Sequence, residues 1–256
     1  MPASELWLSD LMDQQYGVGQ WTKRTGIGQG SDIGPALQLG LTQLRATVGR
    51  GKIKIDSGTW LMTTPPGPEL LSGNYLEGEG SQASIIFYNN ATGAAFWFSG
   101  AGGYTGGGLR GLGIILEHGM GATNALAVLM QGDSAFQPDQ SEFEDLYITA
   151  QNNDYWFTGF EAYGNLRTSP QGIRVAKMEN VQVFNCRNAG IYLSNVVEWT
   201  LNGIGAFVGA GGGNNIYVTG GGSSATNSVH VQGQNVIGNL IVNNCSDVVL
   251  NGTRYA

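Results

Sequence analysis

The chain has 256 residues, of which 42 are glycine and only 12% are charged, and its formal net charge is −7. Such an acidic chain lacks the basic stripe that nucleic acids require, and no apolar run reaches the roughly 18 residues of a membrane span, so neither nucleic-acid binding nor membrane insertion is predicted. The apolar content of 41% excludes a disordered chain. Abundant glycine with little charge favours many short strands joined by tight turns.

Residues 1–30 begin with "MPASELWLSDLMDQQ" and continue into the glycine-broken "YGVGQWTKRTGIGQG". Acidic residues stand where a signal peptide needs a basic and then an apolar stretch. We therefore expect the protein to be made in a cytoplasm without Sec export. Because this segment shows no clear hydrophobic period, it is interpreted as an N-terminal arm that attaches the protein to a partner.

A single amphipathic helix is predicted within residues 31–49. Asp32 is a plausible N-cap, and Gly49 stands where helices commonly end on glycine. Between them, apolar residues recur at three- to five-residue spacing, namely Ala36, Leu37, Leu41, Leu44 and Val48. We predict no other helix.

The rest of the chain is predicted to consist of strands and turns. One sequence pattern recurs. In it, a polar pair or a glycine is followed by apolar residues at every second position and then by Asn or Gly. It returns at intervals of 19 to 35 residues as "LRGLGIIL", "FEDLYITA", "MENVQVFN", "VEWTLNG", "NSVHVQG" and "SDVVLNG". A constant strand motif with variable loops is typical of a solenoid, and the Asn residues suit left-handed backbone at its corners.

We therefore predict an all-β fold in which residues 31–256 form a right-handed parallel β-helix, capped at its N-terminal end by the helix of residues 31–49. A β-sandwich would need neither the cap nor so many glycines, and a propeller would show a regular repeat of about 40–50 residues. The segment "GKIKID" would open the first coil. In it we expect Ile53 to point inward and Lys52 and Lys54 outward, where the lysines keep a partly unpaired strand from pairing with another chain.

Two cysteines, Cys186 and Cys245, each end a similar phrase, "VQVFNC" and "LIVNNC". They could form a disulfide or a metal pair, or they could be small residues at equivalent turns of a repeat. With coils roughly 4.8 Å apart, two or more coils separate them by about 10 Å or beyond, which is too far for a disulfide. We expect free thiols.

Residues 32–87 resemble the opening of the pectate-lyase-like right-handed β-helix superfamily. The order is a helix, then G-x-G-x-I-x-I-x-x-G-T-W-L-M, then L-E-G-E-G-S-x-x-S-I-I. The matching residues are Gly49, Gly51, Ile53, Ile55, Gly58, Thr59, Trp60, Leu76, Gly78, Gly80, Ile85 and Ile86. Without a signal peptide, the chain is most similar to bacteriophage tailspikes and depolymerases within that superfamily.

This resemblance implies a trimeric virion spike that binds, and often cleaves, bacterial surface polysaccharide. The chain departs from the family in two ways. It is much shorter than full tailspikes, and it lacks the Asn-Thr-Asp and Asp-Asp motifs of polygalacturonases. No catalytic role is therefore carried over from the family.

Carboxylates and aromatic residues gather between residues 133 and 163, a combination that suits sugar binding. Glycoside hydrolysis needs two carboxyl groups across the scissile bond, so the candidate catalytic residues are Asp154, Glu161 and Glu144. The candidate substrate-binding residues are Tyr147, Tyr155, Trp156, Tyr163, Arg167 and Arg174. The alternative is that the carboxylates are merely solvated and the aromatic rings pack between coils. No metal site or cofactor is indicated, although Ca²⁺ is possible.

The function predicted from the sequence is therefore a phage spike or fibre protein of the virion that recognises, and possibly depolymerises, host surface polysaccharide. The alternatives are a polysaccharide lyase or glycoside hydrolase and a purely structural virion decoration protein. Its expected partners are the polysaccharide, other tail or capsid proteins bound through residues 1–30, and two further copies in a homotrimer.

Overall fold

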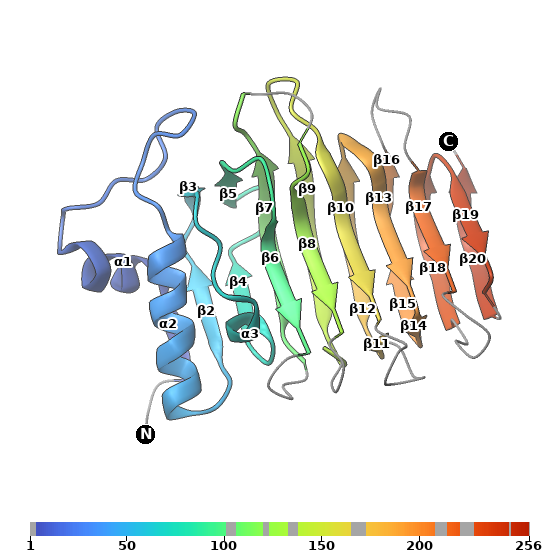
Figure 1. Ribbon diagram of the computed structural model, residues 1–256, viewed down its shortest axis with the longest axis horizontal. Helices are drawn as coiled ribbons and strands as arrows, with labels where there is room; N and C mark the ends of the chain where they lie inside the picture. The colour runs from blue at the N-terminus through green and yellow to red at the C-terminus, as the bar shows by residue number, and fades with distance from the viewer. Residues whose placement is uncertain are drawn as a thin grey trace.

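The protein is a parallel β-helix whose coils stack along the long axis of the molecule (Figure 1). A computed structural model describes residues 4–100, 106–119, 123–132, 138–164, 173–207, 214–220, 228–245 and 247–255. All pairings between its named strands are parallel. The predicted fold class is therefore confirmed.

Two large sheets and one small sheet make up the coils. The twelve-stranded sheet contains β1 (Glu5–Trp7), β2 (Lys52–Ile55), β3 (Gly58–Met62), β4 (Tyr75–Gly78), β5 (Ser84–Tyr88), β7 (Gly108–Leu116), β9 (Glu142–Ala150), β12 (Lys177–Phe184), β15 (Trp199–Asn202), β16 (Gly205–Phe207), β18 (Ser228–Ile237) and β20 (Asp247–Tyr255). The six-stranded sheet contains β6 (Ala94–Ser99), β8 (Leu126–Gln131), β10 (Trp156–Tyr163), β13 (Cys186–Ser194), β17 (Asn214–Thr219) and β19 (Leu240–Asn243). The third sheet pairs β11 (Ile173–Arg174) with β14 (Val196–Val197).

The larger sheet presents two outward faces. The first half of β7 pairs with β4, and its second half pairs with β5. Each coil therefore contributes three stretches of strand, two to the larger sheet and one to the six-stranded sheet. Between these stretches the described corners carry residues of positive φ, many of them Asn, such as Asn180, Asn185 and Asn195. The predicted use of Asn at corners is thus confirmed.

The core is a single stack of inward side chains that runs through the coils. Ile53 and Ile55 are fully buried, as predicted, while Lys52 and Lys54 alternate with them on the outer side. Further along, Phe160 lies between neighbouring aromatic rings, 4.7 Å from Phe143 and 6.1 Å from Trp199 between centroids. Neighbouring coils therefore share one continuous core.

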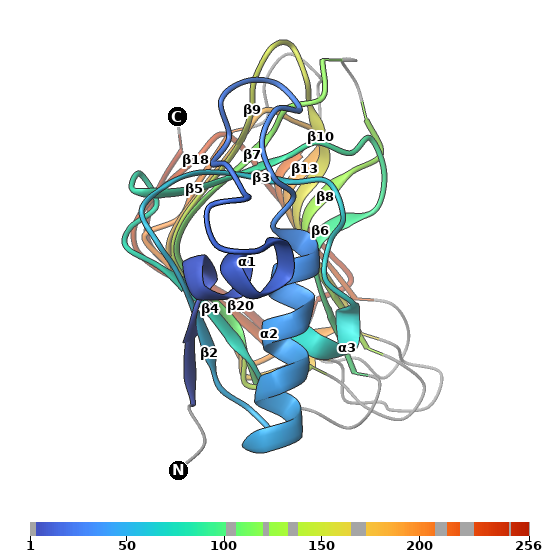
Figure 2. The ribbon, with the colours of Figure 1, turned by 90° about the vertical axis from the view of Figure 1, so that its left-hand side faces the viewer.

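Helices close the N-terminal end of this core (Figure 2). The predicted helix is α2 (Gly34–Thr47), and it ends before Gly49, whose φ is 75°. Asp32 precedes it, and its carboxylate accepts a hydrogen bond from the Gly34 N–H at 3.0 Å. A short helix, α3 (Pro68–Leu71), packs beside β6. No helix in the described ranges is long and apolar enough to cross a bilayer.

The prediction of a single helix is wrong, because α1 (Leu8–Tyr16) precedes α2. Leu8, Leu11 and Met12 are fully buried and belong to the same core as the coils. Strand β1 pairs with β2, so β2 is not the exposed first strand that its lysines were expected to protect. The predicted boundary at residue 31 therefore does not separate an arm from the β-helix.

Residues 17–33, here called the strap, lie along the N-terminal edge of β3 (Figure 1), where the backbone N–H of Arg24 donates to the Thr59 carbonyl at 3.0 Å. The guanidinium of Arg24 lies 3.6 Å from the centroid of the Phe87 ring and forms an ion pair with the buried Glu117. The backbone N–H of Ile33 donates to the Leu61 carbonyl at 2.8 Å. The strap therefore covers the edge of β3 and the Phe87 ring.

Both cysteines are free thiols, as predicted. Their turns are not equivalent, however. Cys186 follows β12 of the larger sheet and opens β13, whereas Cys245 follows β19 of the six-stranded sheet. The similar phrases around them are strands of different sheets, because both sheets use the same alternation of apolar and polar residues.

Candidate functional site

The three predicted catalytic carboxylates do not meet in one site. Glu161 points outward from the six-stranded sheet, and Glu144 points outward from the larger sheet, so the core separates them. Asp154 is buried, and its carboxylate accepts hydrogen bonds from the backbone N–H groups of His118 and Gly119 at 2.8 and 2.9 Å. The prediction that the three act together as a catalytic set is wrong.

The predicted substrate-binding residues are also spread over the molecule. The Trp156 ring is fully buried, stacks on Tyr88 and donates from its Nε1 to the Thr149 carbonyl at 2.7 Å, so the prediction that it binds sugar is wrong. Tyr147 stands on the second face of the larger sheet, 5.6 Å from the Phe184 ring.

The other predicted binding residues lie near chain corners or on the six-stranded sheet. Tyr155 is half-buried just before β10, and Tyr163, at the end of β10, is 44% exposed. Arg174 lies in β11 and donates its backbone N–H to Asp139. Arg167 falls outside the described residues.

The first face of the larger sheet carries charged side chains of both signs. Most of them face an opposite charge on a neighbouring coil, although Glu144 and Glu179 face each other. We call this set the charged face; it consists of Glu5, Lys52, Lys54, Glu77, Arg110, Glu142, Glu144, Lys177 and Glu179. Lys52 lies 3.0 Å from Glu5 and 3.4 Å from Glu77, and Arg110 pairs with Glu142. Opposite charges in neighbouring strands stabilise a sheet modestly.

Beside the charged face, where the strands of the larger sheet begin, lies a depression with a volume of about 370 Å³. We call it the glycine groove. It is lined by Ser4, Arg50, Gly51, Lys52, Gly73, Tyr75, Gly106, Gly107 and Gln140. A second depression of about 350 Å³ continues from Gln140 towards Thr200.

Four of the nine lining residues of the glycine groove are glycines. Gly73, Gly106 and Gly107 occupy corner positions with φ values of 82°, 80° and 96° for which glycine is best suited. A Cβ at Gly107 would lie 2.6 Å from the Asn74 carbonyl oxygen, so a larger residue cannot fit there without a shift. Gln140, at the entrance of the next coil, borders both depressions.

Tyr75 is the aromatic residue of the glycine groove. It is half-buried, and the Arg110 guanidinium lies 4.8 Å from its ring centroid. Burial, and then the neighbouring Glu142 carboxylate, raise the pKa of the Tyr75 phenol above its usual value. The phenol therefore keeps its proton at neutral pH and can donate a hydrogen bond.

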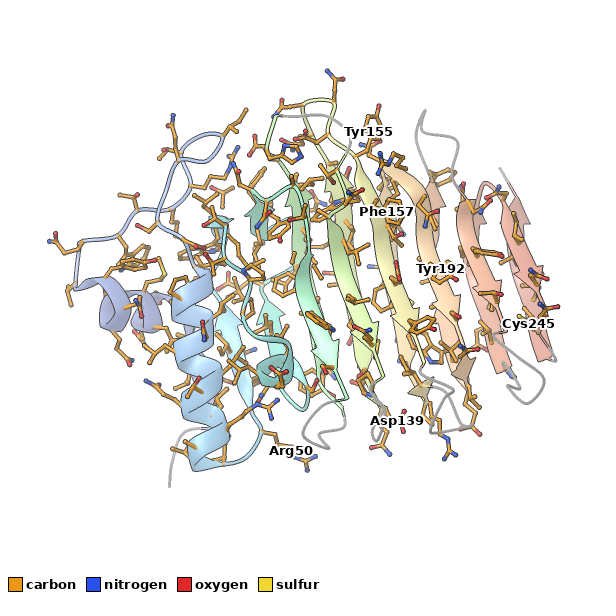
Figure 3. The ribbon with its side chains drawn as sticks, in the orientation of Figure 1. Arg50, Asp139, Tyr155, Phe157, Tyr192 and Cys245 are labelled. Atoms are coloured by element: carbon orange, nitrogen blue, oxygen red, sulfur yellow. The ribbon has the colours of Figure 1, made fainter. Side chains whose placement is uncertain are left out.

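Arg50 adds a cation at the rim of this groove, and Figure 3 shows it projecting at the lower edge of the molecule. The residue is exposed and forms no ion pair within the described ranges. The groove thus combines a ring, a phenolic O–H and a free guanidinium. Such a combination binds oxygen-rich ligands, because the ring packs on apolar ring faces and the N–H and O–H groups bind oxygen atoms.

A second candidate surface covers the six-stranded sheet. Its outward positions form two rows, together called the tyrosine face. The first row is Trp97, Leu129, Glu161, Tyr192, Tyr217 and Ile241, and the second is Ser99, Gln131, Tyr163, Ser194, Thr219 and Asn243. Tyr192, in the middle of this sheet, is labelled in Figure 3. In the described part of the chain, no cluster of three or more His, Cys, Asp or Glu residues could hold a metal ion.

Sequence reasoning missed both surfaces, although each left a signal. "FWF", "IYL" and "IYV" in β6, β13 and β17 place an aromatic residue between two inward apolar residues, which marks one recurring outward position. Glycines just before β2, β4 and β7 mark the hollow corner. Neither signal involves the carboxylates from which the predicted site was built.

Comparisons with known proteins agree on the fold. No family model matches the chain, and no curated protein matches it. Among solved structures, the A-module of mannuronan C-5 epimerase AlgE4 from Azotobacter vinelandii superposes with a TM-score of 0.62 at 14% identity, over 97% of this chain and 72% of the module. ORF18 of Geobacillus virus E2 is matched over 98% of this chain and 59% of its own at 13% identity, but its TM-score of 0.30 carries no argument. The first likeness shows that the chain has the fold of a parallel β-helix.

Proposed function

We propose that the protein binds a bacterial surface polysaccharide and that the glycine groove is the binding site. The observation that carries this proposal is the hollow itself. At successive coil entrances, residues that include several glycines border a hollow of about 370 Å³ beside Tyr75, Arg50 and Lys52. This volume lies within the range of about 300–1,000 Å³ that is usual for small-ligand sites.

The direction of the groove suits a linear polymer. The first depression is lined by residues that precede β2, β4, β7 and β9, and the second continues along β9, β12 and β15. With coils roughly 4.8 Å apart, a chain lying along this edge would contact several coils in turn. Alternating cations and carboxylates offer it both donors and acceptors, as sugar hydroxyl groups require.

The biological setting belongs to the same proposal. The likeness of residues 32–87 to the pectate-lyase-like β-helix superfamily, to which bacteriophage tailspikes belong, supports a spike or fibre protein of a phage virion, made in the host cytoplasm. In that setting the N-terminal segment would contact other tail or capsid proteins, and three copies would assemble. The shared fold with an epimerase named for mannuronan supports a polysaccharide as the ligand.

Chemical modification or cleavage of the polysaccharide is the second candidate function. A tyrosine phenol is protonated at neutral pH, and burial and the nearby Glu142 carboxylate raise the pKa of Tyr75 further, so this phenol is a proton donor. A protonated phenol beside a carboxylate is a pair that could exchange protons with a bound sugar. The release of reducing ends and the absorbance of unsaturated uronates would both be followed with capsular polysaccharides.

Binding is tested with the purified full chain and a panel of capsular and surface polysaccharides by calorimetry. We expect Tyr75→Ala and Arg50→Ala each to weaken binding at least roughly tenfold, which corresponds to about 1.4 kcal/mol. Arg187→Ala removes a cation that lies away from the groove, against the Phe157 ring, and should leave binding unchanged. Loss of binding in Tyr147→Ala with full binding in Tyr75→Ala would place the site on the other face and refute the proposal.

A further inference from the structure

The rim of the glycine groove is built from one position of each coil. On the first face of the larger sheet, six neighbouring strands each contribute one residue to a stack in register, namely Lys52, Tyr75, Gly108, Glu142, Lys177 and Thr200. Two residues earlier in each coil stand the residues that we call the rim ladder, namely Arg50, Gly73, Gly106, Gln140, Val175 and Glu198. All six line one or both of the depressions. A ligand in the groove would therefore meet the rim ladder along its length.

Backbone hydrogen bonds continue from the strands into the rim ladder. The N–H of Gln140 donates to the Arg174 carbonyl at 3.1 Å, and the N–H of Val175 donates to the Val197 carbonyl at 2.9 Å. Each bond joins a rim residue to the residue just before its neighbour in the ladder, which is the pattern between the paired strands themselves. The members of the ladder are therefore stacked like the strands that follow them.

The two ends of the rim ladder carry opposite charges. Arg50 stands at one end and Glu198 at the other, separated by five coil intervals, or about 24 Å at roughly 4.8 Å per coil. The four residues between them are uncharged. Within the described ranges, neither end residue forms an ion pair, whereas Lys52, Glu142 and Lys177 beside the rim each do. The rim thus offers a ligand a cation at one end and an anion at the other.

We infer that the glycine groove selects a polysaccharide that carries isolated acidic groups and disfavours a polyanion with a charge on every sugar. This inference rests on the proposed function and names the ligand class of the same site. The guanidinium of Arg50 fits a carboxylate or a phosphate group. A polyanion with one group at Arg50 would place another close to Glu198, where like charges repel each other.

The middle of the rim ladder suits uncharged sugar units. Gly73 and Gly106 have no side chain, and the Tyr75 ring and the Gln140 amide border the same hollow. An aromatic ring packs on the apolar face of a sugar, and an amide both donates hydrogen bonds to hydroxyl groups and accepts them. The groove therefore combines a site for one anion with a longer stretch for neutral units.

Calorimetry with the full chain tests this inference at Arg50. Each acidic polysaccharide of the panel that binds is compared with its carboxyl-reduced form, or with the form that hydrofluoric acid has dephosphorylated where the acidic group is a phosphate. Wild type should bind the neutralised form at least roughly tenfold more weakly than the native form, and Arg50→Gln should bind both forms alike. Glutamine is compatible with the rim ladder, because Gln140 occupies it with a φ of 57°. Arg187→Gln removes a cation away from the groove and should keep the full difference.

Polygalacturonate, which has a carboxylate on every sugar, provides a test in the opposite direction. Wild type should bind it more weakly than the sparsely charged polysaccharides. Glu198→Gln should bind it roughly threefold more tightly than wild type, because a charge interaction at an exposed site is modest. Glu161→Gln, which removes a carboxylate from the six-stranded sheet, should leave its affinity unchanged. A gain of affinity cannot come from misfolding.

Three results would overturn this inference alone. They are equal binding of the native and neutralised forms by wild type, binding confined to neutral polysaccharides, and an affinity of Glu198→Gln for polygalacturonate that equals that of wild type. In each case a polysaccharide still binds, so the proposed function stands. If no polysaccharide binds in any form, the proposed function is refuted and this inference with it.

Discussion

Replacing Phe160 with alanine tests the inward and outward alternation on which both surfaces depend. Phe160 is fully buried in the middle of β10, in edge-to-face contact with Phe143 and Trp199. Tyr163 lies three residues further along the same strand, but it points outward and is 44% exposed. Tyr163→Ala is therefore a control of similar size, on the same strand and the opposite side of the sheet.

The expected cost follows from the contacts that are lost. Truncation of a buried Phe to Ala costs about 3–5 kcal/mol in all. Because Phe160 loses two aromatic contacts, we place Phe160→Ala in the upper part of that range, at about 4–5 kcal/mol. At roughly 2–4 °C per kcal/mol for a chain of this size, the melting temperature should fall by about 8–20 °C. Differential scanning calorimetry measures both variants. If Tyr163→Ala lowers the melting temperature as much as Phe160→Ala does, the assignment of inner and outer faces is refuted.

Three further predictions concern single side chains. Asp32→Ala should lower the free energy of unfolding by about 2–3 kcal/mol, because its carboxylate accepts three backbone N–H groups and a threonine hydroxyl; a loss below about 1 kcal/mol in urea unfolding would contradict this. A disulfide reagent should modify the half-buried Cys245 of the native protein quickly and Cys186 only on unfolding, because burial raises the pKa of Cys186 to about 12; equal rates would contradict the structure. Glu161→Gln should raise the melting temperature at pH 7 but not at pH 3. Burial raises the pKa of this carboxyl in the folded state, so the charged form costs stability above the unfolded pKa of about 4.3, and an unchanged melting temperature at pH 7 would argue against that burial.

The sequence predicts the coils because their signal is local. Three signals each depend on only a few neighbouring residues. They are the alternation of apolar and polar residues around Ile53 and Ile55, the Asn residues at corners, and the glycine after the helix. The N-terminal helix α1 was missed although Leu8, Leu11 and Met12 stand at helical spacing. The helical spacing in α1 extends over only a few residues before the glycine-rich strap begins, so it did not stand out. Strand β1 could not be predicted locally, because its partner, β2, lies 45 residues further along the chain.

The site could not be predicted from residues that cluster in the sequence, because consecutive residues of a strand point to opposite sides of its sheet. Asp154 and Trp156 turn into the core, while Glu161 faces solvent on one sheet. The glycine groove instead joins residues from the entrances of five strands, which lie up to 136 residues apart in the sequence, from Ser4 to Gln140. Only the register between coils brings these residues together, and register depends on loop lengths that vary.

The stacking of coils also constrains how this molecule can change in length. Every complete coil adds one outward position to each row, so inserting one would extend the groove edge and the tyrosine rows by the same roughly 4.8 Å. A longer ligand track and a longer tyrosine face would thus be gained together. Descendants of such a chain would be expected to differ by whole turns, while insertions at the corners could remodel one side and leave the other intact.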